Sequence, residues 1–188
     1  MQAIEALLRR YSARSLTEPA PDDAALGLIL ESATRAPDHG RLRPWRFIVI
    51  RSEGRQAFGE LLADHLRRTK GPVSDEAVER ERRKAFRAPL IIVVAAIVTP
   101  EGKIPAIEQI LSAGAAAENV MVGAYALGYG CAWKTGDAAY DDEVKAAFGL
   151  SPADAIVGFM YLGSFANPPP PAPAVDIDDY MSEWPADA

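Results

Sequence analysis

The sequence predicts an α+β layered fold, with helices on both faces of a small sheet. Residues 90–98 form an unbroken apolar run rich in β-branched side chains, which is typical of a strand buried on both faces. In residues 105–127, apolar side chains circle much of the helical axis, so solvent contacts little of this segment. Two further strand-like segments, 46–50 and 156–162, supply the rest of the predicted sheet.

The first elements follow from spacing and capping residues. Ile4, Leu7 and Leu8 recur at helical intervals and predict a short helix that ends near Arg9-Arg10. After a loop over 15–21, Asp22 or Asp23 can cap a second helix that runs through Arg35. The sequence Pro-Asp-His-Gly at 37–40 ends this helix and leads into the strand at 46–50.

The middle and the end of the chain alternate between helices and strands. Residues 53–86 predict two helices divided at 70–73, and Ser74 is the expected N-cap of the second. Oppositely charged neighbours along that second helix favour a solvated surface helix over a binding element. Beyond the long helix, residues 128–133 turn into a short strand. A short helix is expected over 141–148 before the last strand.

The length favours one domain over 1–165 followed by a proline-rich, acidic arm over 166–188. Hydrophobic residues make up 49% of the chain and charged residues 24%, values that exclude a disordered, collagen-like or fibrous protein. A single cysteine, Cys131, excludes an internal disulfide and favours a reducing cytoplasm. No run has the length and composition of a membrane span, and the N-terminus lacks the features of a secretory signal.

The net charge of −6 argues against a nucleic-acid partner. The charge is unevenly distributed, because the last 53 residues hold ten acidic residues and one basic residue, Lys145. Residues 1–135 therefore hold 19 basic and 16 acidic residues, a balance of +3. A modestly basic body of this kind can bind a small anion such as a phosphate ester.

The sequence gives little support for a nucleophilic side chain, a metal site or a dinucleotide-binding motif. A nucleophilic Cys131 with His39 or His65 as base is disfavoured, because a lone cysteine in a strand of small residues usually serves packing. Two histidines without a cluster of other ligands predict no metal site. Gly128-Tyr-Gly130 follows a helix instead of a strand and lacks the third glycine, so it is no dinucleotide fingerprint. We expect no catalytic side chain.

Two arginine-rich segments remain. Residues 9–15 place three arginines, a tyrosine and two serines directly after a helix, and residues 35–45 form a turn before a strand. Guanidinium and hydroxyl donors suit a phosphate or an electron-rich carbonyl. An exposed basic helix end and a plain surface turn explain the same residues equally well.

Taken together, these segments resemble the flavin nitroreductase family, and more narrowly its small YdjA-like branch. The matching motifs, in order from residue 2 to about 164, are Arg-Arg-Tyr-Ser-x-Arg at 9–14, Arg-Ala-Pro-Asp-His at 35–39 with Pro-Trp-Arg-Phe at 44–47, Phe-Arg-Ala-Pro-Leu at 86–90, Glu-Gln-x-x-Ser-Ala-Gly at 108–114, Gly-Tyr-Gly-x-x-Trp-Lys-Thr-Gly at 128–136 and Ile-Val-Gly-Phe-x-Tyr-Leu-Gly at 156–163.

The resemblance implies a three-layer fold with a small, mainly antiparallel sheet. It also implies a homodimer with FMN in two sites at the subunit interface, and the helix at 105–127 as the centre of that dimer. Turnover would be ping-pong: NAD(P)H reduces the flavin, which then reduces a small-molecule electron acceptor such as a nitro-aromatic or a quinone. Because the cofactor supplies this chemistry, no side-chain nucleophile is required.

The resemblance also implies which residues bind the cofactor. Arg10, Tyr11 and Ser12 would contact the flavin, with Arg10 near the pyrimidine edge and Ser12 nearer the ribityl phosphate. Arg35 and His39 would reach the flavin of the partner subunit. The segment of Trp133, Lys134 and Thr135 would lie against the ring, where the family presents a backbone N–H to flavin N5.

The sequence also departs from the family pattern. Tyr11 stands where arginine is common, and no Lys or Arg follows Lys145, although many relatives grip the phosphate with basic residues near the C-terminus. Arg14 or Arg41 is a possible replacement. The alternatives are a catalytically silent FMN-binding protein for storage or sensing, and a flavin-free interaction module. Neither the acceptor nor the choice between NADH and NADPH follows from the sequence.

Overall fold

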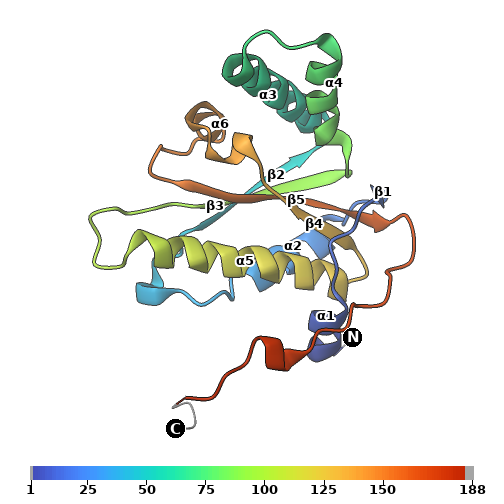
Figure 1. Cartoon of the computed structure of the whole chain (residues 1–188), viewed down its shortest axis with the longest axis vertical. Coiled ribbons are helices and arrows are strands. Elements are labelled where there is room, and N and C mark those ends of the chain that lie inside the picture. The colour runs from blue at the N-terminus through green and yellow to red at the C-terminus, as the bar shows by residue number, and fades with distance from the viewer. Residues whose placement is uncertain (1, 185–188) are drawn as a thin grey trace.

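The computed structural model describes residues 2–184, and it confirms the predicted α+β class: a five-stranded sheet lies between two layers of helices (Figure 1). The helices are α1 (Ala3–Arg9), α2 (Asp23–Ala33), α3 (Glu53–Lys70), α4 (Asp75–Arg83), α5 (Ala106–Ala126) and α6 (Asp142–Ala147). The strands are β1 (Leu16–Thr17), β2 (Trp45–Arg51), β3 (Leu90–Ala96), β4 (Gly130–Lys134) and β5 (Ala155–Phe165). Short 3-10 turns include η1 (His39–Arg41), η2 (Lys84–Phe86), η3 (Asp137–Tyr140) and η4 (Ile177–Asp179).

The last strand of the chain, β5, organises the sheet. It pairs with β3, β4 and β1, and β2 pairs with β3, all in antiparallel orientation. A parallel bridge between Ser12 and Cys131 attaches the segment after α1 to the outer edge of β4. The sheet is therefore mainly antiparallel, as the family resemblance implies.

Helices α2 and α5 cover one face of the sheet (Figure 1). The predicted buried character of α5 is confirmed on the side that meets the sheet and α2, where residues such as Ala117, Val120 and Ala124 are fully buried. Its other side is open, since Ile107 and Leu111 are exposed. The expectation that solvent contacts little of this helix is therefore wrong for that side.

The opposite face of the sheet carries α3, α4 and α6 (Figure 1). Phe58 and Leu62 of α3 pack with Ile91 of β3 and Phe159 of β5 in a second core cluster. Because β3 is buried on both faces, the core lies on both sides of the sheet, as the apolar run predicts.

The predicted caps are largely confirmed. Asp22 accepts a hydrogen bond from the amide of Ala25 at 2.8 Å, and Ser74 accepts one from Ala77 at 3.2 Å, so each begins its helix. Helix α2 ends at Ala33, two residues before the predicted end. The predicted loop over 15–21 contains β1, which forms only because the end of β5 is beside it.

After β5 the chain extends past α1 as an arm with one short turn, η4 (Figure 1). Its side chains between 167 and 184 are exposed. The division into a domain over 1–165 and an arm over 166–188 stays a prediction, and residues 185–188 lie outside the described part of the chain.

A partly buried ionic cluster joins α6 to α3. The Asp141 carboxylate accepts the backbone N–H groups of Glu143 and Val144 at the start of α6. The same carboxylate lies 2.5 Å from Arg68 Nη2 and 3.4 Å from His65 Nδ1. The hydrogen bond from Arg68 lowers the pKa of Asp141 to about 2, against the opposing effect of burial.

Replacing this carboxylate tests its contribution to stability. Because the pKa of Asp141 is lowered in the folded state, its stabilisation is present above its ordinary pKa and is lost as the pH falls toward 2. Asp141→Asn keeps an N-cap but loses the charge, so we expect a loss of about 1–2 kcal/mol at pH 7, allowing for the partial exposure of Arg68. Urea unfolding followed by circular dichroism at pH 7, 4 and 2.5 should show the difference shrinking. A difference that stays constant with pH would contradict this role.

Candidate functional site

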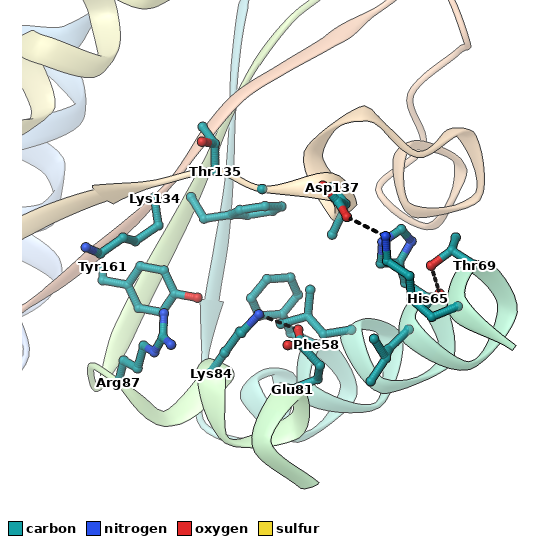
Figure 2. A pocket seen from close by; sticks show the side chains of 16 residues that line it. Phe58, His65, Thr69, Glu81, Lys84, Arg87, Lys134, Thr135, Asp137 and Tyr161 are labelled. Carbon is teal, nitrogen blue, oxygen red and sulfur yellow. Dashed lines mark hydrogen bonds and ion pairs between the residues drawn. The ribbon is translucent and has the colours of Figure 1, made fainter. Parts of the chain in front are cut away.

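A cavity of about 390 Å³ lies between α3, the end of α4 and the strands β4 and β5 (Figure 2). Its apolar lining comes from α3 and β5 and includes Phe58, Leu62, Phe159 and Tyr161. Its polar lining includes His65, Lys70, Glu81, Lys84, Arg87, Lys134, Thr135 and Asp137. An apolar cavity with a few convergent polar groups is the usual form of a small-molecule site.

The register of β4 against β5 decides which side chains enter this cavity. Lys134 lies opposite Phe159, and Ala132 lies opposite Tyr161. Because side chains alternate between the two faces of a strand, Lys134, Phe159 and Tyr161 share the face that α3 covers. Two predicted site residues, Lys134 and Thr135, therefore line the cavity.

The Trp133 side chain lies on the opposite face, toward α5. Its indole Nε1 donates a hydrogen bond to the Val157 carbonyl at 3.1 Å. Gly158 makes this possible, because a Cβ at position 158 would overlap the indole ring. The backbone of Trp133 can still take part in the site, but its side chain does not line the cavity.

The cavity holds more positive charge than its acidic residues balance. Lys84 pairs with Glu81 at 2.5 Å, and Lys70 pairs with Asp137 at 3.2 Å. Arg87 and Lys134 form no ion pair within residues 2–184. Figure 2 shows these two cations and Tyr161 together on one side of the cavity, with His65, Thr69 and Asp137 on the other. The site is thus suited to an anionic ligand.

Tyr161 supplies a neutral donor beside these cations. Its side chain is 4% exposed, and burial raises its pKa to about 12, although Arg87 opposes the shift. The hydroxyl is therefore protonated at neutral pH and points toward the cavity (Figure 2). Cys131 is buried, and burial raises the pKa of its thiol to about 12, so the thiolate needed for a nucleophile is scarce at neutral pH.

The predicted residues after α1 lie elsewhere. Arg10, Tyr11 and Ser12 line a second cavity of about 580 Å³, together with Arg14, Ser15 and the proline-rich segment 167–173. Arg10 Nε lies 2.9 Å from Glu118 Oε1 of α5, a close ion pair whose atoms are not aligned for a hydrogen bond. The Tyr11 ring stacks on Phe165 at 5.6 Å between centroids.

Arg35 and His39 lie at the other end of α5. His39 Nδ1 is 2.5 Å from Glu108 Oε2 in the first turn of α5, and Arg35 is 3.5 Å from Glu31. Glu108 and Glu118 are ten residues apart, so His39 and Arg10 contact this helix at points roughly 15 Å apart along its axis. Neither Arg35 nor His39 lines a cavity with the other predicted residues in one chain.

Sequence reasoning missed several cavity residues. Arg87 lies within a motif quoted for the family resemblance, but nothing local gives its role. Lys84 belongs to the charged run that predicts a solvated helix, and Tyr161 resembles any apolar residue of a core strand. Helical spacing could have placed Lys84 and Arg87 on the same side of their helical segment. It could not have shown that this side faces β4.

Among residues 2–184 there is no cluster of three potential metal ligands, and no helix is long and apolar enough to cross a bilayer.

Comparison with known families and curated proteins gives consistent matches. The model of the nitroreductase family matches residues 7–164. "Putative NAD(P)H nitroreductase YdjA" of Escherichia coli (strain K12) is 40% identical over 186 residues, covering 93% of this chain and 98% of the relative. "Putative NAD(P)H nitroreductase" of Haemophilus influenzae is 34% identical over 165 residues, covering 87% of this chain and 89% of the relative.

Solved structures show the same similarity. A nitroreductase-like family protein from Bacillus cereus superposes with a TM-score of 0.84 at 25% identity, covering 99% of this chain and 97% of its own. A structure from Desulfovibrio desulfuricans, described as a "putative nitroreductase in complex with fmn", has a TM-score of 0.76 at 25% identity and covers 98% of both chains.

Proposed function

Because this chain belongs to the nitroreductase family, we propose that it is an FMN-dependent NAD(P)H oxidoreductase that reduces nitro-aromatics, quinones or similar acceptors in two alternating steps. Family membership itself makes the protein an oxidoreductase. The observation that carries the finer proposal is the cavity at the end of β4, where Arg87 and Lys134 lack ion-pair partners among the described residues.

The residues of this cavity fit a flavin ring. Phe58 and Phe159 offer apolar surface against which a planar ring can pack. Arg87 and Lys134 form no ion pair among residues 2–184, and the protonated Tyr161 hydroxyl points toward the cavity. A ring that gains negative charge on reduction is the kind of ligand that such donors favour.

When bound, FMN accepts a hydride from NAD(P)H and delivers electrons to the acceptor. Arg87 and Lys134 hold positive charge at the cavity wall, which favours the electron-rich state of a bound ring. A backbone N–H of the segment 133–135, as the family resemblance implies, would orient the ring without adding a competing acid. Tyr161 stays protonated and donates a hydrogen bond, while Phe58 and Leu62 limit the entry of water.

The second cavity suits the phosphate end of the cofactor. Ser12 and Arg14 face the same space, and the proline-rich segment 167–173 lines another side of it. Because Arg10 is already paired with Glu118, we assign the main phosphate contact to Arg14 and the hydroxyl of Ser12. With this assignment, Arg14 and Ser12 take the place of the basic residues near the C-terminus that this chain lacks after Lys145.

A homodimer would bring Arg35 and His39 to the same site. Helices α1 and α5 leave five large apolar residues exposed: Ile4, Leu7, Leu8, Ile107 and Leu111. A second copy related by a two-fold axis across α5 covers such a surface with its own equivalent. His39 of η1 and Arg10 contact α5 toward its opposite ends. The same axis would therefore place η1 of one subunit near Arg10 of its partner. This supports, for both residues, the role that the family resemblance implies.

The purified protein should be yellow and should release FMN on denaturation. Under anaerobic conditions, NADH or NADPH should bleach the flavin absorbance within seconds, and adding a nitro-aromatic or a quinone should restore it. Colourless protein that takes up no FMN at micromolar concentration contradicts the proposal. Flavin that binds but is not bleached by either nucleotide indicates the catalytically silent alternative.

Lys134→Gln tests the electrostatic role of the cavity. Removing this cation should make the bound flavin harder to reduce, and we expect its two-electron reduction potential to fall by about 30 mV, or about 1.4 kcal/mol. Arg67→Gln removes a positive charge from the exposed side of α3 outside the cavity and should leave the potential unchanged. Equal potentials for wild type and Lys134→Gln, at equal flavin content, would contradict the role of Lys134.

Leu111→Arg tests the proposed dimer. Leu111 is 63% exposed on α5, so an arginine is tolerated in an isolated chain but places two charges into a two-fold interface. We expect wild type to sediment as a dimer, and the variant to sediment as a monomer with reduced FMN content. Leu28→Arg, at an exposed leucine of α2, is the matched control and should remain dimeric. A monomeric wild-type protein with full FMN content would exclude the shared site.

A further inference from the structure

A stripe of charged side chains runs along one side of α4 and continues into η2. Residues 76, 80, 83, 84 and 87 recur at intervals of three and four, so they lie on one side of the helix. Together they line a groove of about 400 Å³ whose residues are Glu76, Arg80, Arg83, Lys84 and Arg87. The groove thus has four cationic residues and one acidic residue.

This groove adjoins the proposed flavin cavity. Lys84 and Arg87 line both spaces, so they form the boundary between them. Figure 2 shows the two side chains at the edge of the cavity, on the segment that follows α4. A ligand that enters the cavity and extends past this edge lies along the groove.

Two of the four cationic residues in the groove have no acidic partner among the described residues. Arg80 and Arg87 form no ion pair among residues 2–184. Arg83 is 74% exposed and has only Glu79, one turn earlier, as its partner. Arg82, in contrast, is held on the α3 side of the helix by Glu60 and Glu79. Within the groove, Lys84 is paired with Glu81, so Arg80 and Arg87, together with the exposed Arg83, supply the charge that a ligand can use.

We propose that this groove binds the 2′-phosphate of NADPH, so that Arg80 and Arg83 make NADPH the preferred reductant. The inference rests on the proposed function, because the nicotinamide must reach a ring in the cavity while the rest of the nucleotide extends outside. NADH and NADPH differ only in this phosphate, which carries about two negative charges at neutral pH. Paired guanidinium groups are well suited to bind it.

A binding experiment tests the groove without turnover. Calorimetric titration of the FMN-loaded protein with 2′,5′-ADP and with 5′-ADP compares two adenosine ligands that carry two phosphates each but place them differently. We expect 2′,5′-ADP to bind about tenfold more tightly at low salt, because charge-assisted bonds to Arg80 and Arg83 need a phosphate at the 2′ position. Arg80→Gln with Arg83→Gln should reduce this ratio to about one.

The control is Arg67→Gln on α3. Arg67, like Arg83, is exposed and pairs with an acid of its own helix, Asp64, but it does not line the groove. This variant should keep the tenfold ratio. Equal affinities for the two ligands in wild type, or a ratio that the double variant leaves unchanged, would overturn the proposal.

Steady-state kinetics give a second readout. They also distinguish a failure of the groove proposal from a failure of the proposed function. Wild type should show a kcat/KM for NADPH about tenfold above that for NADH. The double variant should lose this preference through a higher KM for NADPH, with little change in kcat. A yellow enzyme that both nucleotides reduce equally well refutes the role of the groove but leaves the proposed function standing. Protein that takes up no FMN refutes the proposed function, while binding of 2′,5′-ADP still tests the groove.

Discussion

The antiparallel register of β5 with its neighbours is the constraint on which the site depends. β5 pairs with β3 and β4 and aligns Lys134 with Phe159. A slip of one residue between β4 and β5 would turn every β4 side chain to the other face. Lys134 would then point toward α5, and Trp133 would point into the cavity. The buried side chains on both faces of the sheet make such a slip costly, so core packing also positions the polar groups of the cavity.

Much of the fold follows from local sequence patterns. The apolar run at 90–98 and the long helix at 105–127 correspond to β3 and α5 within a few residues, and Ser74 caps α4 as expected. These features are local, because a buried strand, an apolar helix and an N-cap each depend on near neighbours in the chain. β1 was not predicted, since two residues form a strand only where the end of β5 is beside them.

The site was less accessible to such reasoning, because its residues meet through long-range contacts. Lys134 and Thr135 were identified through the family resemblance, and the structure adds Lys84, Arg87 and Tyr161 from other elements. Because side chains alternate along a strand, Trp133 and Lys134 are expected on opposite faces of the sheet. Only the packed structure shows that the Lys134 side chain is on the face covered by α3. The net charge of −6 likewise conceals the local surplus of cations, since much of the negative charge lies in the last 53 residues.

The position of Trp133 has an optical consequence. Its half-buried indole is hydrogen-bonded to Val157 and packed over Gly158, on the back of the strand whose front lines the cavity. Of the other two tryptophans, Trp184 is 94% exposed in the arm and Trp45 begins β2. Emission from Trp184 should therefore resemble that of an indole in water, whereas the fluorescence of Trp133 should respond to small displacements of β4. The chain thus contains an intrinsic reporter for events at the cavity, and no dye has to be attached.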